Sequence, residues 1–559
     1  MSSRPILFEP DALEEANMVS KLQEWLMDLT KLKLRSVSSY ILQSVIPLSN
    51  DKVQQFVRNI IQACEVRPHL ISTYAELIGI LYQNKTPQNA LKSLKPYLIK
   101  ALLTPKPFIE QFLANVGDFI FLRNICHTIN ITSEEIVANI RSFCEHHDDL
   151  KYYHCLLFCI FAPELQEADP KFYKSLQELF SEEYAAPSCK LVLKYFYENI
   201  SNLQENNWAL QKECIDHGGY KSSIAVALKT DNLDLFQELA LNSNSDFNGR
   251  IRSSVFEPCQ FMQEKPTYIQ YAGFHGSLKC FKFLLLNGAD LDLTDNLSFT
   301  LGHFVIAGGN IEITRLAAQK SCSFEGCLHI ATRFFRQELF EWLHTNYFHN
   351  LSEIHPRFGS ILHESAASNN ISQILFCYKN GVDINIKTED KSTPLHFAVK
   401  NRKTDAVRLI LRTIGVEVNS KDATGMTPLH IAALFDDPTM TTEVLKNPNV
   451  DINMTNSWGM TALCLAAQDG NDATVKALMQ REDLDINCKD ENSMTPLHYA
   501  AQEGEYETVK VLLTSKKIDV ECKDTRGLIP FSYAEQSGME VTAQLLQDFA
   551  IKRRKAGNN

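Results

Sequence analysis

The chain has 559 residues, of which 45% are hydrophobic and 22% are charged, and its formal net charge is −12. The length corresponds to about two to four domains, because single hydrophobic cores stop growing near ~250–300 residues. The apolar content excludes an intrinsically disordered or collagen-like protein. The acidic balance argues against binding of the whole chain to nucleic acid or to anionic membranes, since both require a basic surface.

The 15 cysteines are scattered along the chain, which starts with polar and acidic residues instead of an apolar signal core. We therefore expect reduced thiols and an intracellular, cytoplasmic location. The longest uncharged apolar stretch, Tyr152 to Pro163, is shorter than the ~20 residues that cross a bilayer. We expect no membrane span.

Residues 1–205 predict an α-helical N-terminal domain. An apolar stripe runs from Val53 to Cys64 at helical spacing, and Thr132-Ser133-Glu134-Glu135 has the pattern of a capping box at a helix start. Prolines divide the segment at intervals that suit short helices, and no alternating run of β-branched residues predicts a strand. We expect about seven to nine helices of ordinary length here.

One group of metal-type side chains lies in this domain, at Cys144, His146, His147, His154, Cys155 and Cys159. Structural zinc sites normally use two short Cys-x-x-Cys knuckles, whereas Cys155 and Cys159 lie in an apolar run. We interpret these residues as buried helical side chains and predict no metal site, with zinc as the alternative.

The sequence contains none of the common catalytic or nucleotide-binding motifs: no Gly-x-Ser-x-Gly, Walker loop, dinucleotide fingerprint or His-Glu-x-x-His. We therefore predict a non-enzymatic protein with no catalytic residues and no cofactor. An enzyme with an unrecognised site in the N-terminal helical domain remains an alternative.

A repeat of about 34 residues dominates residues 357–548. The same short motif recurs at this spacing, as Ser360 to His363, Thr393 to His396, Thr427 to His430, Thr461 to Cys464, Thr495 to His498 and Ile529 to Ser532. Thr-Pro starts a helix, because Thr is a good N-cap and Pro suits the first helical turn. A second helix with apolar residues at i, i+3 and i+4 follows each copy, and Asp-Ile-Asn segments then lead to the next copy.

This helix-turn-helix unit with its Thr-Pro-Leu-His signature resembles the ankyrin repeat. The same frame extends backward into degenerate copies at residues 206–356, through His329, His303, Gln270 and a first copy from Ser222. The unit that starts near His303 is only 26 residues long, and we interpret Leu241 to Lys265 as an inserted polar loop. The predicted fold is all-α: an ankyrin solenoid preceded by a helical domain.

The helical N-terminal half with degenerate early repeats also resembles protist ankyrin-repeat proteins that carry an uncharacterised helical domain ahead of their repeats. The ankyrin resemblance implies protein binding through the concave surface formed by the β-turn fingers and the inner helices, and it does not imply catalysis. We expect a scaffold or adaptor with a protein partner on this concave face, and we do not expect a nucleic acid partner. The oligomeric state is not predicted.

Repeated residues hold a solenoid together, so partner specificity is expected at positions that vary within the frame. Trp458 is a large aromatic residue where the other fingertips are polar, and Leu434 and Phe435 replace polar pairs after the inner helix. Methionines recur just before the repeat motif. The predicted protein-binding residues are Trp458, Leu434, Phe435, Met426, Met460 and Met494, with packing between repeats as the alternative role.

The recurring Thr and His side chains are interpreted as structural, because one frame position is a poor arrangement for a metal or a general base. Each imidazole is expected to bond back to the Thr hydroxyl and across to the backbone of the next repeat. This structural signature comprises Thr393, His396, Thr427, His430, Thr461, Thr495 and His498.

Charge is concentrated near the C-terminus. Residues 451–548 carry 17 acidic and 8 basic side chains, a balance of −9, which predicts a partner with a basic or apolar patch. Residues 549–559 are expected to be a disordered basic tail, in which Lys552-Arg553-Arg554-Lys555 is either a nuclear import signal or a favourable end to the last helix. A nuclear regulator imported by this tail is the second alternative function.

Overall fold

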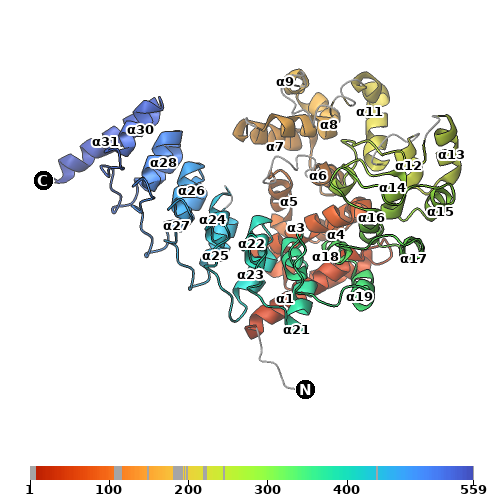
Figure 1. Cartoon of the computed structure of the whole chain (residues 1–559). Helices are drawn as coiled ribbons and strands as arrows, with labels where there is room; N and C mark the ends of the chain where they lie inside the picture. Colours follow the sequence, from red (N-terminus) through yellow and green to blue (C-terminus); the bar gives the residue numbers. More distant parts are fainter. Residues whose placement is uncertain are drawn as a thin grey trace. The chain divides into compact units, whose positions relative to one another are not determined.

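The structure is a computed structural model of the whole chain and describes residues 8–105, 116–147, 150–179, 193, 196, 199–217, 223–242, 246–435 and 438–557. Helices form all of its regular secondary structure in these ranges, which confirms the predicted all-α class (Figure 1). The chain divides into two compact units: residues 1–20 with 347–559, and residues 21–346. The division at Ser20 falls inside the first helix.

The helical region that precedes the repeats contains nine described α-helices up to residue 179 and three short 3-10 turns. The α-helices are α1 (Pro10–Met27), α2 (Leu34–Gln43), α3 (Asn50–Val66), α4 (Ile71–Gln83), α5 (Leu94–Leu102), α6 (Val116–Thr128), α7 (Ser133–His146), α8 (Lys151–Ala168) and α9 (Pro170–Leu179). The turns are η1 (Ile46–Leu48), η2 (Pro68–Leu70) and η3 (Ala90–Ser93). Helix α6 packs on α3, α4 and α8, so it lies between the earlier and later helices of this region.

Local sequence explains two of these helices. The apolar residues of α3 from Val53 to Cys64 lie at helical spacing on the face that points inward, and Val53, Phe56 and Ile60 are fully buried. Helix α7 starts where the side chain of Thr132 accepts a hydrogen bond from the backbone N–H of Glu135.

In the unit of residues 21–346, repeats follow the helix α11 (Ile200–His217). They consist of the helix pairs α12 (Ile224–Lys229) and α13 (Leu233–Asn242), α14 (Tyr268–His275) and α15 (Leu278–Leu286), α16 (Leu301–Gly308) and α17 (Ile311–Gln319), and α18 (Cys327–Arg333) and α19 (Gln337–Asn346). The first helices of these pairs stack in the order α12, α14, α16, α18.

The segment between α13 and α14 differs from the polar loop that we expected. It contains the short turn η5 (Gln260–Met262), and the side chains of Val255, Phe256 and Cys259 are buried. Phe261 packs its ring between four others, with centroid distances of 4.7–6.0 Å. The described part of the insertion, residues 246–265, therefore contributes buried apolar side chains to the core, although we expected a polar loop.

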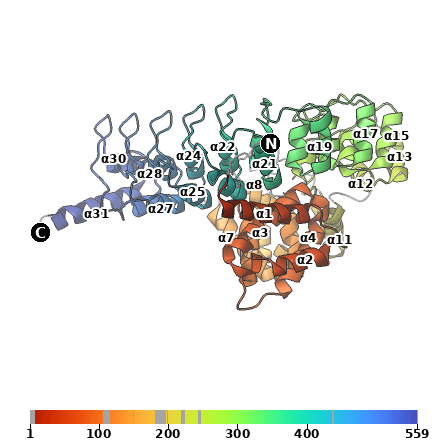
Figure 2. The same ribbon diagram turned by 90° about the horizontal axis from the view of Figure 1, so that it is seen from below.

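The other unit contains the regular repeats. Its helix pairs are α20 (Ile361–Ala367) and α21 (Ile371–Lys379), α22 (Pro394–Lys400) and α23 (Thr404–Leu411), α24 (Pro428–Ala433) and α25 (Thr439–Leu445), α26 (Ala462–Gln468) and α27 (Asp472–Leu478), α28 (Pro496–Glu503) and α29 (Tyr506–Leu512), and α30 (Pro530–Gln536) and α31 (Glu540–Gly557). The pairs follow one another in a row, and the loops between them extend as fingers from one side of it (Figure 2).

An N-terminal segment packs on these repeats within the same unit. The backbone of Phe8 forms a β-bridge with Thr413, and the ring of Phe8 lies 5.1 Å from that of Tyr378. The guanidinium group of Arg412 pairs with the carboxylates of Glu9, Asp11 and Glu15 at 2.6–3.3 Å. These side chains are partly exposed, so the apolar contact of Phe8 contributes more to the docking than the ion pairs do.

The chain end differs from the expected disordered tail, since α31 includes residues 549–557. Arg553 donates hydrogen bonds to the carbonyl oxygens of Ile518 and Lys516, which holds the last turns against the preceding repeat. Basic residues at a helix C-terminus also stabilise the helix dipole. Among the described residues, no helix is both long and apolar enough to cross a membrane.

Candidate protein-binding surface of the regular repeats

The first helices of four regular repeats, α20, α22, α24 and α28, start with the same hydrogen-bonded cap. In α24 the Nδ1 atom of His430 accepts a hydrogen bond from the backbone N–H of Thr427 at 3.1 Å, and the Thr427 hydroxyl accepts one from the backbone N–H of His430. The Nε2 atom of His430 lies 3.1 Å from the carbonyl oxygen of Met460 in the next repeat. Equivalent bonds are made by His363, His396 and His498.

This geometry fixes the chemical state of the histidines. Because Nδ1 accepts a backbone N–H, the proton of the neutral ring is on Nε2, from which it is donated to the next repeat. Burial lowers the pKa of His363 and of His430 to about 4, so both rings are neutral at pH 7. A buried neutral imidazole with both nitrogens bonded is a structural linker and is not available as a general base.

The repeat that starts at Thr461 has Cys464 in place of the histidine. Its thiol lies 3.5 Å from the Thr461 hydroxyl and 3.8 Å from the sulfur of Cys488. The backbone N–H of Cys464 still donates to the Thr461 hydroxyl, so this one hydrogen bond of the cap remains. A small thiol is thus tolerated at this position.

Four fingers are closed by a side chain that our sequence analysis missed. The Oδ1 atom of Asn456 accepts hydrogen bonds from the backbone N–H groups of Trp458 and Met460, at 2.9 and 3.0 Å. Asp422, Asp490 and Asp524 do the same in their fingers. The signal was present as an Asp or Asn at a spacing of 34, four residues before the last residue of each of these four fingers.

A second ladder links neighbouring repeats. Asn453 donates from Nδ2 to the carbonyl oxygen of Asp483 at 2.7 Å, and its Oδ1 accepts the backbone N–H of Asp485 at 2.8 Å. The same pair of bonds is made by Asn385, Asn419 and Asn487. These asparagines therefore fix the spacing of successive fingers.

The six predicted binding residues have different exposures. Trp458 is 55% exposed and Leu434 is 42% exposed. Phe435, Met460 and Met494 are buried, and Met426 is half-buried. The ring of Phe435 is covered by the guanidinium group of Arg402 at 5.1 Å. A direct contact with a partner is thus sterically open to Trp458 and Leu434, while the role of all six remains a prediction.

The two exposed residues lie at opposite ends of the inner helices. Trp458 is on the fingertip before α26, whereas Leu434 caps the C-terminus of α24. A partner that contacts both must extend along the inner helices of two neighbouring repeats, which pack on each other.

Three carboxylates lie at or just after the C-terminal ends of the inner helices α26 and α28. Glu503 lies at the C-terminal end of α28, and Glu505 follows that helix, while Asp469 caps α26. Desolvation, followed by the charge of Glu503, raises the pKa of both Asp469 and Glu505. None of the three has a basic partner within 4 Å among the described residues, so this end of the surface attracts cations.

The described residues contain no group of three or more His, Cys, Asp or Glu side chains placed to hold a metal ion. In the N-terminal helical region, Cys155 and Cys159 are buried in α8, and burial raises the pKa of Cys159 well above its usual range. His154 bonds to the carbonyl oxygen of His147 at 3.0 Å, and Nδ1 of His146 bonds to that of Ser142.

Comparison with known families identifies the repeats. The family described as ankyrin repeats (3 copies) matches residues 362–453 and 435–524, and that described as ankyrin repeats (many copies) matches residues 269–318. The C-terminal half of the chain is therefore an array of ankyrin repeats, preceded by a helical region. No curated protein matches the chain, so the resemblance to protist ankyrin proteins stays a prediction.

Proposed function

We propose that the protein is a non-enzymatic scaffold or adaptor that binds a partner protein along the fingers and inner helices of its regular ankyrin repeats. The observation that carries this proposal is the exposure of the Trp458 ring at a fingertip, beside the half-buried Met426 and the buried Met460 and Met494. Exposed aromatic residues on rigid supports are typical interface hot spots. The finger is rigid because Asn456 closes it and Asn453 ties it to the next repeat.

The chemistry of the partner follows from the neighbouring charges. The unpaired carboxylates of Asp469, Glu503 and Glu505 favour a basic segment, while Trp458 favours an apolar or cationic side chain over its ring. The partner is therefore proposed to be a protein with lysine or arginine residues beside an apolar anchor.

The test uses the full chain as bait for affinity capture, followed by mass spectrometry. We expect Trp458→Ala with Leu434→Ala to lose a captured protein while the unfolding temperature stays nearly constant, because both side chains are exposed. Val541→Ala is the matched control, since Val541 is 69% exposed but lies on the last outer helix. Equal capture by wild type and the double variant would contradict the proposed surface.

The proposed location is cytoplasmic. All 14 cysteines in the described part of the chain are free thiols, which supports a reducing compartment. Nuclear import through Lys552-Arg553-Arg554-Lys555 is the alternative, although Arg553 is already bound to backbone carbonyl groups of the preceding repeat. Replacing Lys552 and Lys555 by alanine and following the protein by microscopy separates the two locations.

A further inference from the structure

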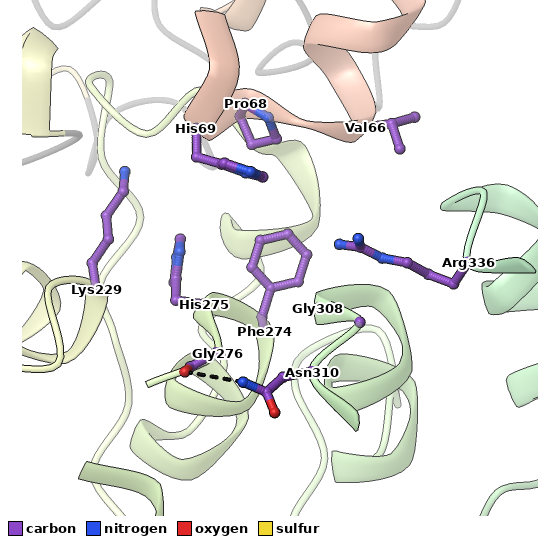
Figure 3. Close-up of a pocket in the computed structure, with 11 residues that line it drawn as sticks. Val66, Pro68, His69, Lys229, Phe274, His275, Gly276, Gly308, Asn310 and Arg336 are labelled. Atoms are coloured by element: carbon purple, nitrogen blue, oxygen red, sulfur yellow. Dashed lines mark hydrogen bonds between the residues drawn. The ribbon is translucent and has the colours of Figure 1, made fainter. Parts of the chain in front are cut away.

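A basic cavity lies in the unit formed by residues 21–346, away from the regular repeats in sequence. Its volume is about 510 Å³, a size that suits small organic ligands. Its walls come from the turn η2, the end of α12 and the ends of α14 and α16 (Figure 3). The lining residues that the argument uses are His69, Lys229, Phe274, His275, Gly309 and Arg336.

Arg336 presents a half-buried guanidinium group to this cavity. Its Nε donates to the carbonyl oxygen of Ala307 at 2.8 Å, and no carboxylate lies within 4 Å of it among the described residues. Glycine is required at position 309, where φ is +82°, because an added Cβ would lie 2.6 Å from the Cζ of Arg336. The backbone thus makes room for the cation to lie at the cavity wall.

A second arginine, Arg67, lies close enough to Arg336 to act on its charge but does not line the cavity. Arg67 is only 5% exposed, and its Nη1 donates to the carbonyl oxygen of Phe334 at 2.9 Å. Burial, followed by the charge of Arg67, lowers the pKa of Arg336. Burial also lowers the pKa of Arg67 to about 10, against the opposing influence of Tyr74 and Asp28. Two neighbouring cations, of which Arg336 has no carboxylate partner among the described residues, favour the binding of an anion.

The nearest carboxylate neutralises the positive charge of Lys229 only in part. Lys229 lines the cavity, and its Nζ lies 3.7 Å from the Oε2 atom of Glu257, which is longer than a hydrogen bond. Glu257 already accepts hydrogen bonds from the Tyr271 hydroxyl at 3.1 Å and from the backbone N–H of Cys259 at 3.1 Å. Lys229 therefore has one long contact with a carboxylate that is already hydrogen-bonded, and Arg336 has no carboxylate partner among the described residues.

Two histidines complete the donor set. Figure 3 shows the rings of His69 and His275 and the guanidinium group of Arg336 pointing into the same space. The Nε2 atom of His275 is buried and has no hydrogen-bond partner among the described residues. A buried ring nitrogen without a partner is costly unless a ligand or water supplies one.

We infer that this cavity binds a small phosphate-bearing anion. Arginine and lysine donors match the phosphate group in charge and geometry, and a ring N–H of each histidine adds a neutral donor. The Phe274 ring forms an apolar wall for the organic part of a phosphate ester. This site is independent of the proposed protein-binding surface.

Binding is tested by calorimetry and thermal unfolding of the full chain with pyrophosphate and with glycerol 3-phosphate. We expect saturable binding and a higher unfolding temperature that sodium chloride of equal ionic strength does not reproduce. Arg336→Met is expected to weaken binding at least about tenfold, because a charge-assisted hydrogen bond is lost. Lys282→Met is the matched control, since Lys282 pairs with Glu312 at the surface of the same unit.

A second variant keeps the inference testable if the Arg336→Met protein does not fold. His69 is exposed at the edge of the cavity, so His69→Asp should fold normally and weaken phosphate binding by charge repulsion. Capture by phosphatidic acid vesicles in addition would show that a lipid-borne phosphate also enters. Binding that is absent at millimolar pyrophosphate, or that is unchanged in the His69→Asp variant, would overturn the inference.

Discussion

The regular repeats from residue 360 onward and the earlier repeats from residue 267 to 346 join neighbouring inner helices in different ways. In the regular repeats a histidine at the third helical position bonds to the residue before the next cap, as His430 does to Met460. In the earlier repeat that starts at Thr267, Gln270 takes this place: its Oε1 accepts the backbone N–H of Thr267, and its Nε2 donates to the carbonyl oxygen of Phe299. The link between repeats therefore depends on one acceptor and one donor, and not on an imidazole.

Further along, the earlier repeats depart more strongly. Helix α18 starts at Gly326, in the left-handed conformation and without a side-chain cap. The rings around Phe261 supply apolar packing in this region that the regular repeats do not need. An inserted side chain thus supplies part of the packing in repeats that lack the Thr-Pro-Leu-His motif.

Acidification should destabilise the regular repeats. The pKa of His363 and of His430 is about 4 in the folded state and about 6.5 when unfolded, so the unfolded chain binds more protons below pH 6.5. Stability is complete above pH 6.5 and is lost as the pH falls toward 4, by at most about 3 kcal/mol for each of the two residues. Urea unfolding at several pH values, with hydrogen exchange of residues 360–536, measures this loss.

Phe261→Ala should destabilise the earlier repeats by about 2–3 kcal/mol, because the half-buried ring loses its contacts with four aromatic rings. Hydrogen exchange of α14 and α16 should accelerate, while that of α24 and α26 stays constant. Leu286→Ala is the control, since Leu286 is 86% exposed and its loss should change stability by less than about 0.5 kcal/mol. An equally small effect of Phe261→Ala would show that the ring of Phe261 does not contribute to the core.

His430→Leu and His430→Gln sharpen the comparison of the two kinds of link. The leucine leaves the N–H of Thr427 and the carbonyl oxygen of Met460 without their partner, which should cost about 2–3 kcal/mol. The glutamine can repeat the bonds of Gln270 and should cost less than about 1 kcal/mol. Denaturant unfolding of both variants gives the difference. Equal losses would show that the ring itself is required.

The smallest expected effect is that of Asn453→Ala, about 1 kcal/mol, because the finger loses two hydrogen bonds that are exposed to water. Faster amide exchange at Asp485 is the specific readout, since this N–H is one of the two groups released. Unchanged exchange there would show that water replaces the asparagine without loss.

Much of the fold was predictable because its signals are local. The capping Thr132, the apolar stripe of α3 and the spacing of the Thr-Pro-Leu-His copies each act within a few residues or at one fixed period. The core role of Phe261 was not predictable, since it depends on rings up to 73 residues away in sequence. The basic cavity escaped for the same reason: Arg67 and Arg336 meet only in the folded chain.

The candidate surface was predicted in part. The fingertip position of Trp458 follows from the repeat frame, but the frame does not give the cover of Phe435 by Arg402 or the finger closure by Asn456. Exposure depends on neighbouring repeats, whereas the period reports only which positions are equivalent.

The central claim is that a partner protein binds along the fingers and inner helices of the regular repeats. The most direct measurement places a photoreactive phenylalanine derivative at position 458 of the full chain, or at position 541 on the last outer helix, and identifies the proteins that crosslink in cells. We predict a specific crosslinked protein from position 458 and none of that identity from position 541. Crosslinks of equal yield to the same protein from both positions, or none from position 458, would contradict the claim.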